Sequence, residues 1–211
     1  PTGKLLMCAS NTFLFSEAHR QDPRVIHEMW DNNMHLMKFS KEIKAGETWR
    51  FSITGSSITS AHHDDPLNEA ERLTIYAKLE GRDRLLQFHN KAWEELWRSD
   101  IQIDGDPQAQ QDVHSMLYHL YSFVREGNSN SPSPMGLSGL GYNGHVFWDT
   151  ELWMFPAILV LHPALGKSMI EYRFQRLESA KRNAFSKGFK GAMYPWESAE
   201  TGVEETPVWA L

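Results

Sequence analysis

Two short segments of the chain each combine a tryptophan with a carboxylic acid. The first is GYNGHVFWDTELW, in which Trp148 precedes Asp149, and the second is YPWES, in which Trp196 precedes Glu197. A carboxylate accepts hydrogen bonds from neutral hydroxyl groups, and an indole offers a flat apolar face beneath a sugar ring. Because both segments stand where a loop meets a helix, the pattern favours one shared pocket for an uncharged carbohydrate.

A structural role for the first segment stays open beside this one. Asp149 stands where a helix is expected to begin, so it could cap that helix, with Thr150 and Glu151 in the first turn. Capping explains the acid but not Trp148 beside it. It also leaves unexplained the preceding loop, 126–144, which is dense in Gly, Ser, Asn and Pro. Long loops of this kind inside a domain are often functional.

Other candidate sites are weaker. The run HHDD at 62–65 has metal-binding residue types, but adjacent histidines point in different directions and no second cluster has ligand spacing. His114 and His119 are five residues apart on a helix and do not share a face. The triplet GKS at 166–168 resembles the end of a phosphate-binding loop, but Leu161 occupies the position that requires glycine. We therefore expect no metal and no cofactor.

Composition excludes several classes of partner. The 21 basic against 27 acidic residues give a net charge of −6 without a basic stripe, so nucleic acid is not an expected partner. No apolar stretch approaches the roughly 20 residues of a membrane helix, so a membrane is not expected either. The single cysteine, Cys8, excludes an internal disulfide. The first residues, PTGKLLMCAS, lack the pattern of a signal peptide, which does not settle the compartment.

The elements that position the two segments change from strands to helices along the chain. Leu5–Phe15 is rich in strand formers, residues 49–53 alternate with a period of two, and KAGE, between Ile43 and Thr48, is expected to close a hairpin. From Pro66 onward the apolar spacing is helical. The expected helices are 66–80, 85–96, 107–124, 149–161 and 164–187. Their expected buried faces include Leu73, Tyr76 and Leu79 in the first helix, and Ile170, Phe174, Leu177, Ala180 and Ala184 in the last. This order predicts a β domain followed by an all-α domain.

At the two segments the sequence resembles the central catalytic domain of glycoside hydrolase family 65. The resemblance rests on GYNGHVFWDTELWM and on YRFQRLESAKRNAFSKGFKGAMYPWESAETGVEETP. It is strong over 105–211 and weaker over 1–104. It implies a mainly α chain with an N-terminal β segment, in which 1–60 form the C-terminal strands of a β-sandwich and 61–104 a helical linker. Residues 105–211 would form the first part of an (α/α)6 barrel.

The resemblance also implies a glucose-binding subsite without a complete catalytic apparatus. The family's general-acid glutamate is expected beyond Leu211, so no catalytic residue is assigned and this chain alone is expected to be inactive. The residues implied to line or border the subsite are Trp148, Asp149, Trp196, Glu197, His145 and Tyr142.

The reaction implied by the family is hydrolysis or phosphorolysis of an α-glucoside. Phosphorylases tend to carry arginine where Met135 and Asn143 stand here, and the run WMFP at 153–156 resembles the hydrolases. We expect part of an inverting hydrolase that acts on a terminal α-glucosyl residue. The alternatives are a phosphorylase that releases β-glucose 1-phosphate, or an inactive sugar-binding fragment. The partner is an α-glucoside, and the rest of the barrel could be a separate chain or the protein a homodimer. A hydrolase would be periplasmic or secreted, and a phosphorylase cytoplasmic.

Overall fold

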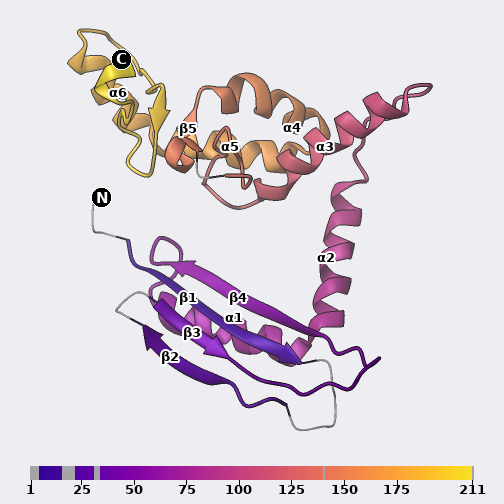
Figure 1. Ribbon diagram of the computed structural model, residues 1–211. Helices are drawn as coiled ribbons and strands as arrows, with labels where there is room; N and C mark the ends of the chain where they lie inside the picture. The colour runs from indigo at the N-terminus through magenta and orange to yellow at the C-terminus, as the bar shows by residue number, and fades with distance from the viewer. Residues whose placement is uncertain (1–4, 16–21, 31–33, 140, 211) are drawn as a thin grey trace. The chain divides into compact units, whose positions relative to one another are not determined.

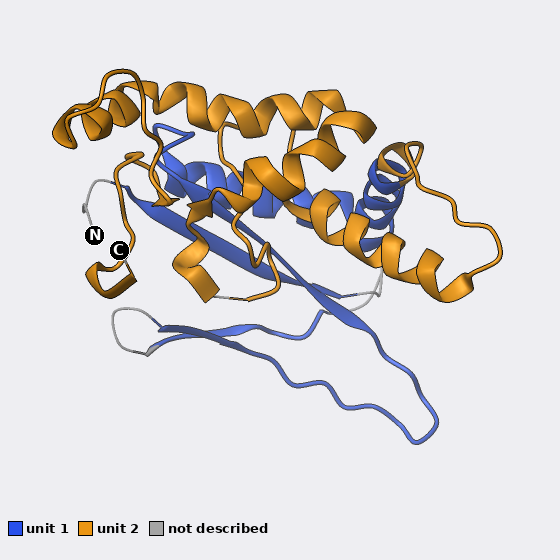
Figure 2. Cartoon of the chain, turned by 90° about the horizontal axis from the view of Figure 1, so that it is seen from above, with its two compact units in different colours: residues 1–93 blue, residues 94–211 orange. Residues whose placement is uncertain are grey.

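The computed structural model contains two compact units, residues 1–93 and 94–211, coloured separately in Figure 2. The residues that it describes are 5–15, 22–30, 34–139 and 141–210. Small antiparallel sheets lie in the first unit, and most of the helices lie in the second (Figure 1). The expected order of strands followed by helices is confirmed in part, because unit 1 also contains the helix Pro66–Glu80 and unit 2 contains the short strands Val146–Phe147 and Glu197–Ser198. None of the described helices is both long and apolar enough to cross a bilayer.

Two strand pairs form the β part of unit 1. Strand β1 (Met7–Phe15) pairs antiparallel with β4 (Phe51–Thr59), and β2 (Ile26–Trp30) pairs antiparallel with β3 (Met34–Lys38). The expected hairpin around KAGE is wrong. A turn is present there, with the Glu47 N–H donating to the Lys44 carbonyl at 3.0 Å, but the strands nearest to it, β3 and β4, pair with other strands.

Helix α1 (Pro66–Glu80) packs on the β1–β4 pair through small and polar side chains. Asp65 caps the helix by accepting from the Asn68 N–H, so the acidic end of the HHDD run has a local structural role. Ala70 is fully buried, and Thr74, which is 5% exposed, donates to the Ser10 carbonyl at 3.2 Å. The expected face is therefore wrong, because close packing on strands selects small side chains. The expected core residues of this helix are exposed: Leu73, Tyr76 and Leu79.

Helix α2 (Arg82–Leu96) follows directly after Gly81, whose φ of +77° suits glycine and ends α1. The expected break between the two helices is confirmed, although it takes a single residue. The apolar face expected for α2 is present in the sequence, but none of its residues is buried.

Unit 2 contains the remaining helices and a third small sheet. Helix α3 (Pro107–Phe123) begins as expected at Asp106, whose carboxylate accepts from two backbone N–H groups. The elements that follow are η1 (Gly141–Gly144), β5 (Val146–Phe147), η2 (Thr150–Met154), α4 (Phe155–Leu161), α5 (Pro163–Gln175), α6 (Leu177–Ser186), β6 (Glu197–Ser198) and η3 (Val208–Ala210). Its core is built mainly by Leu117, Tyr121, Val124, Val146, Phe147, Ile158, Leu165, Met169, Tyr172, Ala180 and Ala184.

The long helix expected over 164–187 is two helices. Arg176, with φ −104° and ψ 13°, separates α5 from α6, and Gly188 (φ +81°) follows α6 as the expected stop. The expected buried face is only partly correct. Ile170 and Phe174 are 41% and 66% exposed, while Tyr172 and Arg173, which hydrogen-bond to neighbouring segments, are buried instead.

Candidate functional site

A two-residue ladder joins the two tryptophan–acid segments. In the antiparallel pairing of β5 with β6, Val146 lies opposite Ser198, and Phe147 lies opposite Glu197. Trp148 therefore emerges from one strand beside Trp196 at the start of the other. The sequence predicts that the segments share a region, but a ladder this short has no periodicity to reveal it.

Four aromatic rings form a continuous wall at this ladder. The rings of Trp148 and Trp196 meet edge to face, with centroids 5.3 Å apart and an interplanar angle of 79°. Phe147 links Trp196 to Tyr142, at 5.7 and 5.2 Å. The Trp148 Nε1–H donates to the Pro195 carbonyl at 2.8 Å, which fixes its indole ring. The two indoles and the Tyr142 ring stay between 42% and 55% exposed, so their surfaces remain available to a ligand.

The two acids of these segments have different environments. Glu197 is buried, at 6% exposure, and its Oε1 accepts a hydrogen bond from His145 Nδ1 at 2.7 Å. Asp149 is half-buried, and its side chain does not cap the helical turn that follows. The capping role that the sequence left open for Asp149 is therefore not filled, and its carboxylate is available as an acceptor.

The backbone before His145 is in an unusual conformation. Tyr142 and Asn143 have φ values of 56° and 53°, and Gly144 follows with 71°. The left-handed region costs a residue with a side chain about 1–2 kcal/mol, and such strain is concentrated at functional sites. The His145 N–H donates to the Tyr142 carbonyl at 2.9 Å and closes this turn. The turn places Tyr142 against Phe147 and His145 against Glu197.

The first tryptophan–acid pair continues into a single π-helical turn, η2. Thr150 is fully buried there and donates to the Pro132 carbonyl at 2.8 Å, which ties η2 to the long loop at 126–144. Such π turns occur frequently at functional sites. The sequence predicts a helix over these residues but contains no signal for the π turn.

Glu204 holds the backbone of the second tryptophan–acid pair. Its carboxylate accepts from the N–H groups of Trp196 and Glu197, both at 3.2 Å, and from the Thr206 hydroxyl at 2.6 Å. Burial acts to raise the pKa of the Glu204 carboxyl, but the hydrogen bonds from Thr206, Glu197 and Trp196 outweigh it and hold the pKa below its usual value. Sequence reasoning missed this residue, since a glutamate seven residues from its partner has no recognisable spacing.

The sequence analysis also did not identify Arg173 as a residue of the site. Its guanidinium, in a residue 6% exposed, pairs with both oxygens of Glu151 and reaches β5 and β6. The neighbouring Tyr172 hydroxyl donates to the Ala199 carbonyl at 2.7 Å. Burial raises the pKa of Tyr172 above its usual value, against the opposing effects of Ser198 and the two nearby arginines. The phenol therefore stays a neutral donor at physiological pH.

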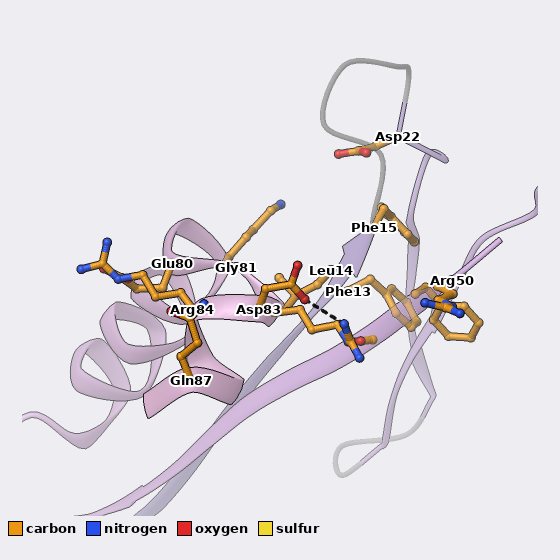
Figure 3. Close-up of a pocket in the computed structure, with 14 residues that line it drawn as sticks. Phe13, Leu14, Phe15, Asp22, Arg50, Glu80, Gly81, Asp83, Arg84 and Gln87 are labelled. Atoms are coloured by element: carbon orange, nitrogen blue, oxygen red, sulfur yellow. Dashed lines mark hydrogen bonds and ion pairs between the residues drawn. The ribbon is translucent and has the colours of Figure 1, made fainter. Parts of the chain in front are cut away.

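Unit 1 has a cavity of its own, of about 710 Å³, drawn in Figure 3. Apolar side chains of β1 line it, together with charged side chains around the junction of α1 and α2. Arg82 pairs with Asp83 at 2.8 Å, and Arg84 with Glu80 at 2.6 Å. Asp22, Arg50 and Lys78 also line the cavity, so it carries charges of both signs.

The site in unit 2 presents aromatic faces and carboxylate acceptors side by side. Within the described residues, no three histidine, cysteine, aspartate or glutamate side chains gather where they could hold a metal ion. The arrangement suits an uncharged polar ring, which would stack on an indole and donate its hydroxyl hydrogens to a carboxylate.

Comparisons with known proteins find similar carbohydrate-active proteins. The chain is 71% identical over all 211 residues to a kojibiose hydrolase of Mucilaginibacter mallensis, and 63% identical over the same length to a kojibiose hydrolase of Flavobacterium johnsoniae. It spans 31% of the length of each. A solved structure described as "Putative kojibiose phosphorylase from human microbiome" matches 99% of this chain with a TM-score of 0.81 at 21% identity, over 27% of its own length.

A family match covers the residues that build the site. Residues 114–211 match the description "Glycosyl hydrolase family 65 central catalytic domain". This range includes the aromatic wall, both acids and the network around Arg173. The resemblance seen in the sequence is confirmed: residues 114–211 match the central catalytic domain of glycosyl hydrolase family 65.

Proposed function

We propose that the whole protein is an inverting α-glucoside hydrolase and that this chain contributes its subsite for the terminal glucosyl residue. The observation that carries the proposal is the juxtaposition of Trp148 and Asp149 with Trp196 and Glu197 across the β5–β6 ladder. The identity of 71% and 63% to two kojibiose hydrolases supports it and makes kojibiose the first substrate to test.

The proposed role of each side chain follows from its surroundings. The exposed faces of the two indoles stack against the glucosyl ring, because the C–H face of a pyranose is apolar. The Asp149 carboxylate accepts hydrogen bonds from sugar hydroxyls, and its charge makes these bonds stronger than neutral ones. Glu197, already oriented by His145, offers its second oxygen to another hydroxyl. Tyr142 borders the same ring.

Inversion needs a carboxylic acid that protonates the leaving oxygen and a carboxylate that activates water on the opposite face, about 6.5–9.5 Å apart in known enzymes. We propose that both groups come from parts of the whole protein outside these 211 residues, which span 31% of the two hydrolases. This chain then binds and orients the glucosyl unit, and the isolated polypeptide does not turn over substrate.

The larger architecture is part of the same proposal. Residues 1–60 would be strands of a β-sandwich, 61–104 a helical linker, and 105–211 the first helices of an (α/α)6 barrel. The small antiparallel sheets followed by helices support it, as does the fold match with a TM-score of 0.81.

The test is hydrolysis of kojibiose by the whole protein with and without inorganic phosphate, followed by NMR of the first product. We expect β-glucose at a rate that phosphate does not change. Release of β-glucose 1-phosphate only when phosphate is present would assign the phosphorylase alternative. A whole protein that binds glucose without turnover would assign the inactive sugar-binding alternative.

A further inference from the structure

We propose that Arg173 is a positioning residue that holds the two tryptophan–acid pairs in register for the glucosyl ring; this inference rests on the proposed function. Arg173 lies on α5, and its side chain has a relative exposure of 8%. It touches neither tryptophan–acid pair directly. It acts through the residues that flank them.

The contacts of Arg173 reach both sides of the ladder. Its Nε and one terminal nitrogen donate to the two oxygens of Glu151, at 2.8 and 2.7 Å. That nitrogen also donates to the Phe147 carbonyl at 3.1 Å, and the other terminal nitrogen donates to Ser198 Oγ at 3.2 Å. A planar guanidinium can make this set of bonds, whereas a lysine ammonium cannot bind a carboxylate in the same two-point geometry.

Each of these partners is next to, or one residue removed from, a proposed sugar-binding side chain. Phe147 precedes Trp148, and Glu151 lies two residues after Asp149 in the π turn. Ser198 follows Glu197 in β6. One buried cation therefore contacts residues on both sides of the first pair and on one side of the second: the backbone of Phe147 and the side chains of Glu151 and Ser198.

The strength of this network suits a positioning role. A bidentate, partly buried arginine–carboxylate pair has a defined geometry, and removal of one partner leaves a buried charge uncompensated. Displacement of binding groups by about 1 Å can cost an enzyme about 100-fold in rate. A small shift of β5 against β6 would separate the two indoles, so the site depends on this arginine although it contacts neither tryptophan–acid pair.

Arg176 offers a matched control in the same part of the fold. It is buried to a similar degree, at 8% exposure, and it pairs with Glu200 at 3.3 Å. It also donates to the carbonyls of Tyr172 and Ala199. These contacts stabilise the start of α6, but none of them involves η2 or a residue of the β5–β6 ladder.

The experiment compares Arg173→Lys with Arg176→Lys in the whole protein. Thermal unfolding, the dissociation constant for glucose, and kcat and KM for kojibiose are measured for each. We expect both variants to unfold at lower temperature. Arg173→Lys alone should also weaken glucose binding by about tenfold and lower kcat/KM by about 10- to 100-fold. Folded Arg173→Lys with unchanged glucose affinity and kcat/KM would overturn the proposal, and so would equal losses in Arg176→Lys.

A second readout keeps the inference separate from the proposed function. The indole N–H of Trp148 donates to the Pro195 carbonyl, so its NMR signal reports the geometry of the site without any substrate. We expect this signal to shift or broaden in Arg173→Lys and not in Arg176→Lys. If the wild-type protein neither binds nor cleaves an α-glucoside, the proposed function fails, while an unchanged indole signal in Arg173→Lys overturns the positioning role.

If Arg173→Lys does not fold, Glu151→Gln tests the same link. The substitution keeps the shape of the side chain but removes the charge that pairs with Arg173. We expect weaker glucose binding with the fold intact. Wild-type affinity in folded Glu151→Gln would overturn the proposal.

Discussion

At the scale of single residues, the two acids of the site differ in burial and in the hydrogen bonds that they already make within the protein. Glu197 is buried and bonded to His145, whereas Asp149 is half-buried and does not cap the turn that follows it. The difference makes Asp149 the acceptor whose loss should be felt most directly by a sugar. It also means that a change at Asp149 disturbs the surrounding protein less than a change at Glu197.

We expect Asp149→Asn to weaken glucose binding by about 1.5–3 kcal/mol, because the amide loses the charge that strengthens hydrogen bonds from sugar hydroxyls. Isothermal titration of the whole protein with glucose measures the change. Glu205→Gln is the control, since it removes one negative charge from an exposed side chain near the site. If the affinity for glucose falls equally in both variants, or if it falls in neither, Asp149 does not belong to the site.

At the scale of elements, the turn after β6 packs closely on the start of α6. Gly202 has a φ of +68°, and a Cβ built there would lie 2.7 Å from the Arg176 Cβ. Gly188, with a φ of +81°, has open space at the same position. A comparison of alanine substitutions at these two glycines therefore distinguishes the effect of backbone strain from that of steric overlap.

We expect Gly202→Ala to destabilise the protein more than Gly188→Ala. Both variants carry the left-handed penalty of about 1–2 kcal/mol, but only Gly202→Ala must also displace the Arg176 side chain. Thermal unfolding of the two variants measures the difference. Equal melting temperatures would show that the turn can shift away from the Arg176 side chain without a cost in stability.

The carboxylate of Glu204 should make the turn around β6 sensitive to acid. The pKa of Glu204 is lower in the folded protein than in the unfolded chain, where it is about 4.5. The ionised carboxylate therefore stabilises the fold fully above about pH 4.5, and this stabilisation is lost as the pH falls through the lower pKa of the folded state. We expect Glu204→Gln to lower the melting temperature of the whole protein by a constant amount at neutral pH. The gap to wild type should then narrow below about pH 4.5. A gap that stays constant down to acid unfolding would contradict this, and Glu205→Gln controls for the loss of one charge.

Local signals in the sequence predict several of the helix boundaries. Asp106 before Pro107 starts α3, and Gly81 and Gly188 end helices, because caps and left-handed turns depend on the residue itself. The buried faces are predicted less well. Thr74 and Arg173 are buried because distant segments supply hydrogen-bond partners for them, and no helical period reveals such partners.

At the site, too, the sequence indicates the residue types but not the contacts between distant segments. Residue types alone indicate that the two tryptophan–acid segments belong together, since each repeats the same combination at a loop–helix junction. The ladder that joins them is two residues long, and the positive φ values of Tyr142 and Asn143 occur at residues other than glycine. Neither feature leaves a pattern in the sequence, because both are imposed by the surrounding structure.

At the scale of the whole molecule, the chain exposes more surface than its mass requires. Its accessible surface is 15,537 Å², whereas a folded monomer of this mass exposes about 10,000 Å², and two separate domains of half the mass about 12,000 Å² together. Many large apolar side chains of the described residues are exposed. Among the described residues, the large apolar side chains that are at least 75% exposed are Leu79, Leu137, Trp153, Val160, Phe185, Val208 and Trp209.

Surface of this kind is normally covered by other protein, since large exposed apolar patches mark interfaces. The 211-residue polypeptide produced alone should therefore bind the dye ANS and unfold over a broad temperature range, as loosely packed states do. The whole protein should bind little dye and unfold sharply. A monomeric 211-residue polypeptide with a sharp transition and no dye binding would show that it forms a closed core by itself. The proposal that the rest of a barrel covers side chains such as Val160 and Phe185, which are 81% and 84% exposed, would then be contradicted.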